Sequence, residues 1–300
     1  MPAQRLFRFG VMAAEATSSD EWQAIARKAE MLNYSTLLVP DHFVNFFSPV
    51  AALMAAADAT ERLRVGSFVF ANDFRHPALL AKDIATLDVL SKGRFELGIG
   101  AGWLQAEYEQ LGIAYESAGI RISRLEEALH IIRGLLSEES VTFSGNYYAV
   151  NGLEGRPRPI QQPYPPIFIG GGGKRQLTMA AREADIVGIH FKARPDGKTE
   201  FWERSLAGLA QKVEWVRLAA GTRFEAIELN LLVSQVAVTG GRQESATKFA
   251  REMPFVLLGS VDQIVEDLLI QRERYHISYI VIYEKDMEMF APVVAKLSGK

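Results

Sequence analysis

Asp41 and His42 are adjacent polar residues that directly follow a short apolar run, Ser35 to Pro40, which we expect to be a β-strand. In a parallel sheet both side chains would lie at the carboxyl edge, where α/β proteins bind their ligands. An imidazole exchanges a proton near neutral pH, and a neighbouring carboxylate can orient another group by hydrogen bonding. We therefore predict that His42 is a catalytic proton donor or acceptor. The alternative is a loop-capping carboxylate beside a structurally hydrogen-bonded histidine.

The stretch from Arg94 to Trp103, RFELGIGAGW, is an apolar run that ends in small residues beside an aromatic side chain. Small residues at a strand end let the backbone approach a flat cofactor. The glycines come near to the G-x-G-x-x-G fingerprint, but Trp103 replaces its last glycine, which argues against a dinucleotide site. The alternative is a tight strand-to-helix turn without a ligand. Four aromatic residues could wall a flat ring, or could be ordinary packing: Trp103, Tyr108, Phe46 and Phe47.

Four consecutive glycines followed by two cations, Gly170 to Arg175, form a third motif. Glycine amides at a helix N-terminus, with Lys174 beside them, are suited to binding a phosphate. A nucleotide-hydrolysing P-loop is excluded, because Phe168 occupies its first glycine position and Arg175 the position of its Ser or Thr. We expect a phosphate cradle here; the alternative is a flexible turn.

Other classes of site and partner are not indicated. The remaining histidines show no metal-ligand spacing and no G-x-S-x-G elbow occurs, so we predict no metal site and no serine nucleophile. The absence of cysteine excludes disulfides and thiolate chemistry. A net charge of -3 and a pI near 6.0 give no general attraction for nucleic acid or anionic membranes. No apolar stretch approaches the roughly 18 residues of a membrane span, and we expect a cytoplasmic protein.

The elements that must position these residues alternate along the 300-residue chain. About eight apolar strands are separated by amphipathic helices, which is typical of a parallel α/β protein. The length and strand count favour a (β/α)8 TIM barrel over a doubly wound sheet, which needs fewer strands and usually carries a dinucleotide fingerprint. We expect a single domain over 1–300. The expected barrel strands are 6–12, 35–40, 63–71, 94–99, 167–169, 184–189, 227–238 and 277–283.

One segment departs from the repeat. Residues 141–150 contain two β-rich runs around Ser144-Gly145-Asn146, which predicts a hairpin, and five prolines follow before residue 167. We expect an insertion near 141–166. A long helix over 201–220 and a short helix over 243–252 are also predicted.

Together these motifs resemble the bacterial luciferase-like family, and more closely its actinobacterial branch that uses the deazaflavin coenzyme F420. The segments that carry the resemblance are Pro40 to Phe43, Ser67 to Pro77, Gly93 to Trp103, Glu107 to Gly112, Arg121 to Leu125, and Pro165 to Gly172. They occur in the family's order over about two-thirds of the chain.

The resemblance implies a TIM-like barrel with insertions, commonly a homodimer, that holds a deazaflavin or flavin at the carboxyl ends of its strands. It implies a non-prolyl cis peptide near Ser67-Phe68 behind the ring. Carried over by position, the expected cofactor contacts are Asp41, Ser67, Phe68, Asn72, Ala101, Gly102, Gly171, Gly172, Gly173 and Lys174, aided at the phosphate by Lys192.

The function that the resemblance implies is hydride transfer between F420 and a small organic substrate, with His42 as the catalytic residue. In the family's sugar-phosphate dehydrogenases, a Glu stands at the position of Trp103 and a Trp at the position of Phe46, and both departures argue against sugar-phosphate oxidation. Two alternatives are an FMN-dependent monooxygenase that uses oxygen and a non-catalytic flavin-binding protein.

Overall fold

Eight strand positions close into a parallel barrel, as the alternation of strands and helices predicted, so the doubly wound alternative is wrong. The computed structural model describes residues 5–43, 47–192, 199–240 and 252–300. The third position pairs with both the second and the fourth, which completes the circle. In chain order the barrel strands are β1 (Arg8–Met12), β2 (Thr36–Val39), β3 with β4 (Arg64–Ser67 and Phe70–Ala71), β5 (Phe95–Gly100), β8 (Ile167–Gly171), β9 (Ile186–Ile189), β10 (Glu228–Leu232) and β13 (Ile277–Tyr283).

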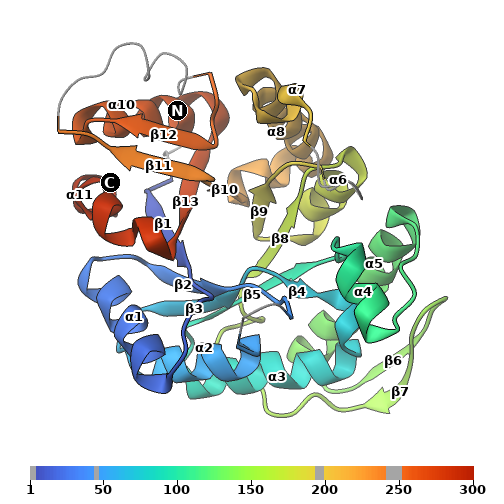
Figure 1. Ribbon diagram of the computed structural model, residues 1–300. Helices are drawn as coiled ribbons and strands as arrows, with labels where there is room; N and C mark the ends of the chain where they lie inside the picture. Colours follow the sequence, from blue (N-terminus) through green and yellow to red (C-terminus); the bar gives the residue numbers. More distant parts are fainter. Residues whose placement is uncertain (1–4, 44–46, 193–198, 241–251) are drawn as a thin grey trace.

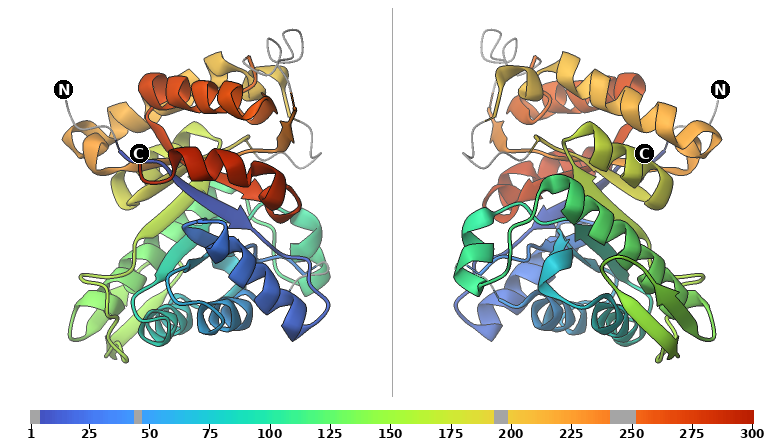
Figure 2. Two further views of the ribbon diagram at one scale, coloured as in Figure 1. Left: turned by 90° about the vertical axis from the view of Figure 1, so that its left-hand side faces the viewer. Right: turned by 90° about the vertical axis from the view of Figure 1, so that its right-hand side faces the viewer.

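Helices surround the strands (Figures 1 and 2). Side chains cap the first turns of some of them: Ser18 Oγ accepts the Glu21 amide, and His76 Nδ1 accepts the Ala78 amide. The helices are α1 (Ser19–Met31), α2 (Pro49–Asp58), α3 (Pro77–Leu90), α4 (Gln105–Leu111), α5 (Ala118–Ser137), α6 (Lys174–Glu183), α7 (Phe201–Arg204), α8 (Leu206–Ala220), α10 (Val261–Tyr275) and α11 (Met287–Leu297).

The third strand position is interrupted, where one continuous strand over 63–71 was expected. Gly66 pairs with Glu96 and Phe70 with Ile99, so this strand carries one residue more than β5 between the two pairs. Ser67 bridges the gap: its Oγ donates to the Gly98 carbonyl (2.7 Å) and accepts the Gly98 amide (3.0 Å). The non-prolyl cis peptide is Phe68–Val69, one residue beyond the position that the resemblance implied.

Two glycines of β5 make room for this segment. A Cβ on Gly98 would lie 1.8 Å from the Ser67 carbonyl oxygen, and a Cβ on Gly100 would lie 2.8 Å from the Val69 side chain. The alternating glycines therefore serve the protein's own packing.

The barrel has an apolar interior above a charged base. Its interior cluster is separate from the larger core between strands and helices, and consists of Leu38, Phe168, Ile186, Leu232, Tyr279 and Val281. At the amino ends of the strands, Arg8 Nη1 lies 2.6 Å from Glu96 and Arg64 Nε lies 2.6 Å from the same carboxylate. Burial alone would raise the pKa of Glu96, but the two guanidiniums outweigh it and lower that pKa.

The expected insertion forms an antiparallel hairpin, β6 (Val141–Ser144) and β7 (Ala149–Leu153). The Glu127 carboxylate on α5 holds its turn by accepting the amides of Asn146 (2.7 Å), Tyr147 (2.9 Å) and Tyr148 (3.1 Å). This confirms the hairpin predicted from Ser144-Gly145-Asn146. It projects from the side of the barrel opposite β11 and β12 in Figure 1.

Two expected elements are divided. The run over 227–238 is not one strand: it leaves the barrel after β10, where Ser234 bonds the Phe255 carbonyl, and continues as β11 (Gln235–Val238), parallel to β12 (Val256–Gly259). The helix over 201–220 breaks at Ser205, whose extended backbone and hydroxyl cap the start of α8. The helix expected over 243–252 lies almost wholly outside the described residues.

Within the described ranges, every helix is too short or too polar to cross a bilayer.

Candidate functional site

The carboxyl ends of the strands surround a half-buried apolar floor. Met12, Phe68, Val69 and Tyr283 are partly buried and pack on the interior cluster. We call these four residues the mouth floor. Gly170 contributes no side chain at the end of β8 and is half-buried, whereas Gly100 at the end of β5 is buried beneath Val69. A flat apolar group fits such a surface.

His42 lies at the rim of the barrel mouth and is held by a carboxylate that the sequence analysis did not assign. Its Nδ1 is 2.9 Å from Oε2 of Glu107, and the Phe43 amide donates to Oε1 of the same carboxylate (2.9 Å). The Glu107 side chain is 4% exposed and that of His42 25% exposed. The Trp103 ring stands edge-on to the imidazole, with centroids 5.7 Å apart.

The Asp41 carboxylate is hydrogen-bonded to other groups of the protein. Its carboxylate accepts the Ala71 amide (3.0 Å) and forms a two-pronged ion pair with Arg75, whose Nη2 is 2.9 Å from Oδ1. It therefore ties the end of β2 to the end of β4 and fixes the backbone on which His42 stands. Ring contact by Asp41 stays a prediction, and its observed partners are protein groups.

The small residues after β5, Ala101 and Gly102, pack against the protein's own side chains. Gly102 has φ +75°, and a Cβ there would lie 1.8 Å from the Tyr108 hydroxyl. Tyr108 is buried and donates to Asp73 Oδ2 (3.2 Å), so it is a packing residue. Ala101 is also buried. Contact of Ala101 and Gly102 with a cofactor tail stays a prediction. Any such contact would be made by their backbone groups.

Of the four aromatic residues expected to wall a ring, Trp103 is the one placed beside His42. Phe47 packs edge-on against Trp22, with ring centroids 6.0 Å apart. Tyr108 is internal, and Phe46 lies outside the described residues. Phe43 is 57% exposed and adds an aromatic group that was not predicted.

Ser67, Phe68 and Asn72 occupy different environments. Phe68 belongs to the mouth floor, and Ser67 supports it through its two bonds to Gly98. Asn72 is buried and its Nδ2 donates to the Tyr148 hydroxyl of the hairpin (3.2 Å), which places it on the side of the insertion. Its Oδ1 has no hydrogen-bond partner among the described residues.

The glycine turn after β8 leads into α6 as predicted. Gly172 is required by packing, since a Cβ there would lie 2.2 Å from the Phe191 carbonyl carbon, whereas Gly173 is surrounded by open space. Gly173 is the N-cap of α6 and provides no side chain to cap it, so the first-turn amides can donate hydrogen bonds to an anion. Gly171 is half-buried and Lys174 is exposed.

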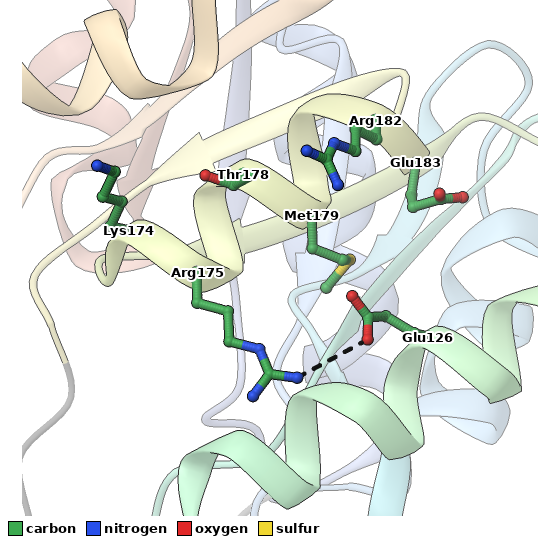
Figure 3. Close-up of a pocket in the computed structure, with 7 residues that line it drawn as sticks. All are labelled: Glu126, Lys174, Arg175, Thr178, Met179, Arg182 and Glu183. Carbon is green, nitrogen blue, oxygen red and sulfur yellow. Dashed lines mark ion pairs between the residues drawn. The ribbon is translucent and has the colours of Figure 1, made fainter. Parts of the chain in front are cut away.

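The two cations of this motif separate in space (Figure 3). Arg175 extends toward α5, where its Nη2 donates to Ser123 Oγ (2.7 Å) and lies 4.0 Å from Glu126. Lys174 points away from α5 and stays at the glycine turn. A groove of about 570 Å³ between α5 and α6 lies outside the barrel mouth. It is lined by Glu126, Lys174, Arg175, Thr178, Met179, Arg182 and Glu183.

A buried polar group supports the loop after β9. Lys212 is fully buried and donates to the His190 carbonyl (2.7 Å) and to Glu203. Glu203 also accepts the Lys192 amide (3.2 Å). Burial, and next the charge of Lys212, lower the pKa of His190 to about 4. His190 is therefore a neutral group at neutral pH, and Lys192 is held near the glycine turn by its backbone.

Glu107 is the main residue that the sequence reasoning missed. Directly after Gly102 the sequence has Trp103 and no carboxylate. In the structure Glu107 and Tyr108 form the buried face of the short helix α4, and a buried acid requires a partner, but the sequence alone does not show that burial.

Comparison with known proteins gives one family and two kinds of relative. The family model of luciferase-like monooxygenases matches residues 5–270. The FMNH(2)-dependent dimethylsulfone monooxygenase of Pseudomonas putida is 33% identical over 134 residues, which cover 45% of this chain and 36% of that protein. An F420-dependent glucose-6-phosphate dehydrogenase of Microbacterium testaceum is 34% identical over 187 residues, which cover 59% of this chain and 55% of that protein.

The chain thus spans about a third to a half of the length of the curated relatives that it matches. Among solved structures, the coenzyme F420 dependent tetrahydromethanopterin reductase from Methanopyrus kandleri aligns with a TM-score of 0.79 at 16% identity. The alignment covers 98% of this chain and 100% of that chain. This likeness concerns the fold.

Proposed function

The chain belongs to the luciferase-like monooxygenase family, and from that membership we propose that it is an oxidoreductase that binds a deazaflavin or flavin at the barrel mouth. The observation that carries the proposal is the position of His42 at the rim of the same mouth whose floor is half-exposed and apolar. A proton-exchanging group and a surface for a flat ring therefore share one end of the barrel.

The residues present fit such a cofactor. The mouth floor offers an apolar surface to a ring system, and the uncapped first turn of α6 with Lys174 offers amides and a positive charge to a phosphate. The cofactor, when bound, supplies hydride or electron transfer. The chain itself orients the ring, keeps water from the ring face that packs on the apolar mouth floor, and holds or delivers a proton at His42.

We favour F420 as the cofactor and a small organic compound as the hydride donor or acceptor. Support comes from the F420-dependent relatives, with the larger matched share, and from the motif order over Pro40 to Gly172. Trp103, 48% exposed beside His42, supports a substrate without a phosphate group, because an indole offers no charge to one. The direction of hydride transfer depends on whether this compound is the donor or the acceptor.

A second candidate function is an FMN-dependent monooxygenase, which the match to the dimethylsulfone enzyme favours. A third is a flavin-binding protein without catalysis. Side-by-side titration of the purified protein with F420 and FMN, followed by protein and cofactor fluorescence, separates the first two. We expect micromolar binding of F420 and weaker binding of FMN. The reverse preference, together with oxygen consumption on reduced FMN, would favour the monooxygenase, and binding of neither would reject the proposal.

His42→Ala tests the catalytic assignment. Removal of the imidazole is expected to lower turnover by about 100-fold or more, while the cofactor dissociation constant changes little. Unchanged turnover in this variant would favour a role of His42 outside catalysis. His76→Ala, at the cap of α3, is the matched control.

The expectation of a cytoplasmic homodimer belongs to the same proposal. Leu79 and Leu90 on α3 are 65% and 56% exposed, and these two apolar side chains are ones that a second copy would cover. Light scattering on the purified protein measures the association state.

A further inference from the structure

Glu107 contacts the histidine turn at two places. Its Oε2 lies 2.9 Å from Nδ1 of His42, and its Oε1 accepts the amide of the next residue, Phe43, at 2.9 Å. The residue is 3% exposed. A buried carboxylate needs hydrogen-bond donors at both oxygens, and here the imidazole and the adjacent backbone supply them.

The contact with Glu107 bears on which imidazole nitrogen carries the hydrogen. An ionised carboxylate only accepts hydrogen bonds, so the nitrogen that faces it must donate. In the neutral imidazole the other nitrogen, Nε2, is then the proton acceptor. We propose that Glu107 is a positioning residue that holds His42 in the Nδ1–H tautomer and thereby makes Nε2 the atom that accepts or returns the proton. The inference deepens the function proposed above and rests on it for its catalytic meaning.

The position of Glu107 is itself fixed by its neighbours. The next residue, Tyr108, anchors α4 through its hydroxyl to Asp73 Oδ2, and its ring occupies the space that a side chain on Gly102 would need. Trp103 meets the imidazole edge-on from the other end of this segment. The spacing from Gly102 to Tyr108 therefore places an aromatic ring and a carboxylate around one histidine.

Nitrogen NMR of protein labelled with ¹⁵N-histidine tests the tautomer directly and requires neither cofactor nor turnover. In alkaline buffer, the His42 signals are identified by their loss in His42→Asn. We expect a protonated Nδ1 and an unprotonated Nε2. In Glu107→Gln, the amide oxygen can keep the Phe43 bond while the amide nitrogen donates to Nδ1, so the two signals are expected to exchange character.

Glu109→Gln is the matched control, because Glu109 lies exposed on the same helix and accepts from Gln105. It is expected to leave the His42 signals unchanged. A wild-type spectrum with an unprotonated Nδ1, or an unchanged pattern in Glu107→Gln, would overturn the proposal. If Glu107→Gln does not fold, the wild-type spectrum decides alone. The expected NMR pattern in a protein that binds neither F420 nor FMN would support the Glu107–His42 pair and reject the proposed function.

Discussion

Gly102 shows how the absence of a single side chain determines the local geometry of the site. Its backbone is left-handed, and the volume beside its Cα is filled by the Tyr108 hydroxyl. Tyr108 in turn fixes α4, which carries Glu107 to His42. The glycine was assigned to a cofactor from sequence, and in the structure its first role is to admit a tyrosine.

Replacement of Gly102 by Ala is expected to destabilise the protein by about 2–4 kcal/mol, because it combines left-handed strain with overpacking against Tyr108. Gly112→Ala is the matched control. Gly112 has φ +69° but nothing within 4 Å of the added Cβ, so only the conformational cost of about 1 kcal/mol should appear. Urea unfolding of both variants measures the difference. Equal losses would mean that Tyr108 moves aside easily.

His190 connects stability to pH. Burial, followed by the charge of Lys212, lowers the pKa of His190 to about 4, whereas an unfolded histidine titrates near 6.5. Between these values the unfolded chain binds the extra proton, so stability is complete above about pH 6.5 and falls as the pH decreases toward 4. We expect His190→Gln to reduce this slope in unfolding experiments. His130→Gln, at an exposed position of α5, should retain it.

At the scale of elements, the third strand position couples the fold to the mouth floor. The Ser67 hydroxyl replaces the missing ladder bonds to Gly98 and so supports the turn that presents Phe68 and Val69. The Ser67 hydroxyl thus links β5 to the turn between β3 and β4.

Ser67→Ala is expected to cost about 1–3 kcal/mol, because it leaves the buried Gly98 amide and carbonyl without their partner. The control is Ser137→Ala, where the hydroxyl donates to the Arg133 carbonyl at an exposed helix end and the expected loss is below about 0.5 kcal/mol. Thermal or urea unfolding tests both. A loss at position 67 no larger than that at 137 would show that water replaces the Ser67 hydroxyl.

Hydrophobic periodicity predicted the elements well where all residues of an apolar run belong to the same helix or strand. The alternation of strands and helices and the Ser144-Gly145-Asn146 turn depend on local chemistry, and both are found in the structure. The breaks at Ser205 and Ser234 depend on capping and on a bond to Phe255, which is distant in sequence. Glu107 was missed for the same reason, since its partner, His42, lies on another element. Tertiary partners cannot be deduced from local spacing.

At the scale of the whole molecule, the two ends of the barrel differ in chemistry. The amino ends of the strands carry Arg8, Arg64, Glu96 and Glu228 in direct ion pairs, with the Arg8 guanidinium 3.7 Å from the centre of the Tyr279 ring. The carboxyl ends carry the apolar mouth floor. Charges at the base join strands from distant parts of the chain, while the opposite end remains suited to binding.

Glu96→Gln should destabilise the whole barrel by about 3–5 kcal/mol, because it leaves two partly buried guanidiniums without their shared carboxylate. Because the pKa of Glu96 is lowered in the folded protein, acid also decreases the free energy of unfolding. The contribution of the ionised Glu96 is present above the unfolded pKa of about 4.3 and is lost as the pH falls below it. Chemical unfolding at neutral pH measures the loss. Glu288→Gln breaks only the exposed pair with Lys28 and should change little. Comparable effects of the two substitutions would argue against a structural role for the base.

The pairing of β1 with β13 joins the first and last strands of the barrel, with Arg8 opposite Tyr279 and Met12 opposite Tyr283. These partners are separated by nearly the whole chain, and both contribute to the base and to the mouth floor. During synthesis the first strand must therefore wait with an unpaired edge until the last strand leaves the ribosome. A nascent chain stalled before residue 277 should be protease-sensitive and a substrate for chaperones, however well its earlier helices have formed.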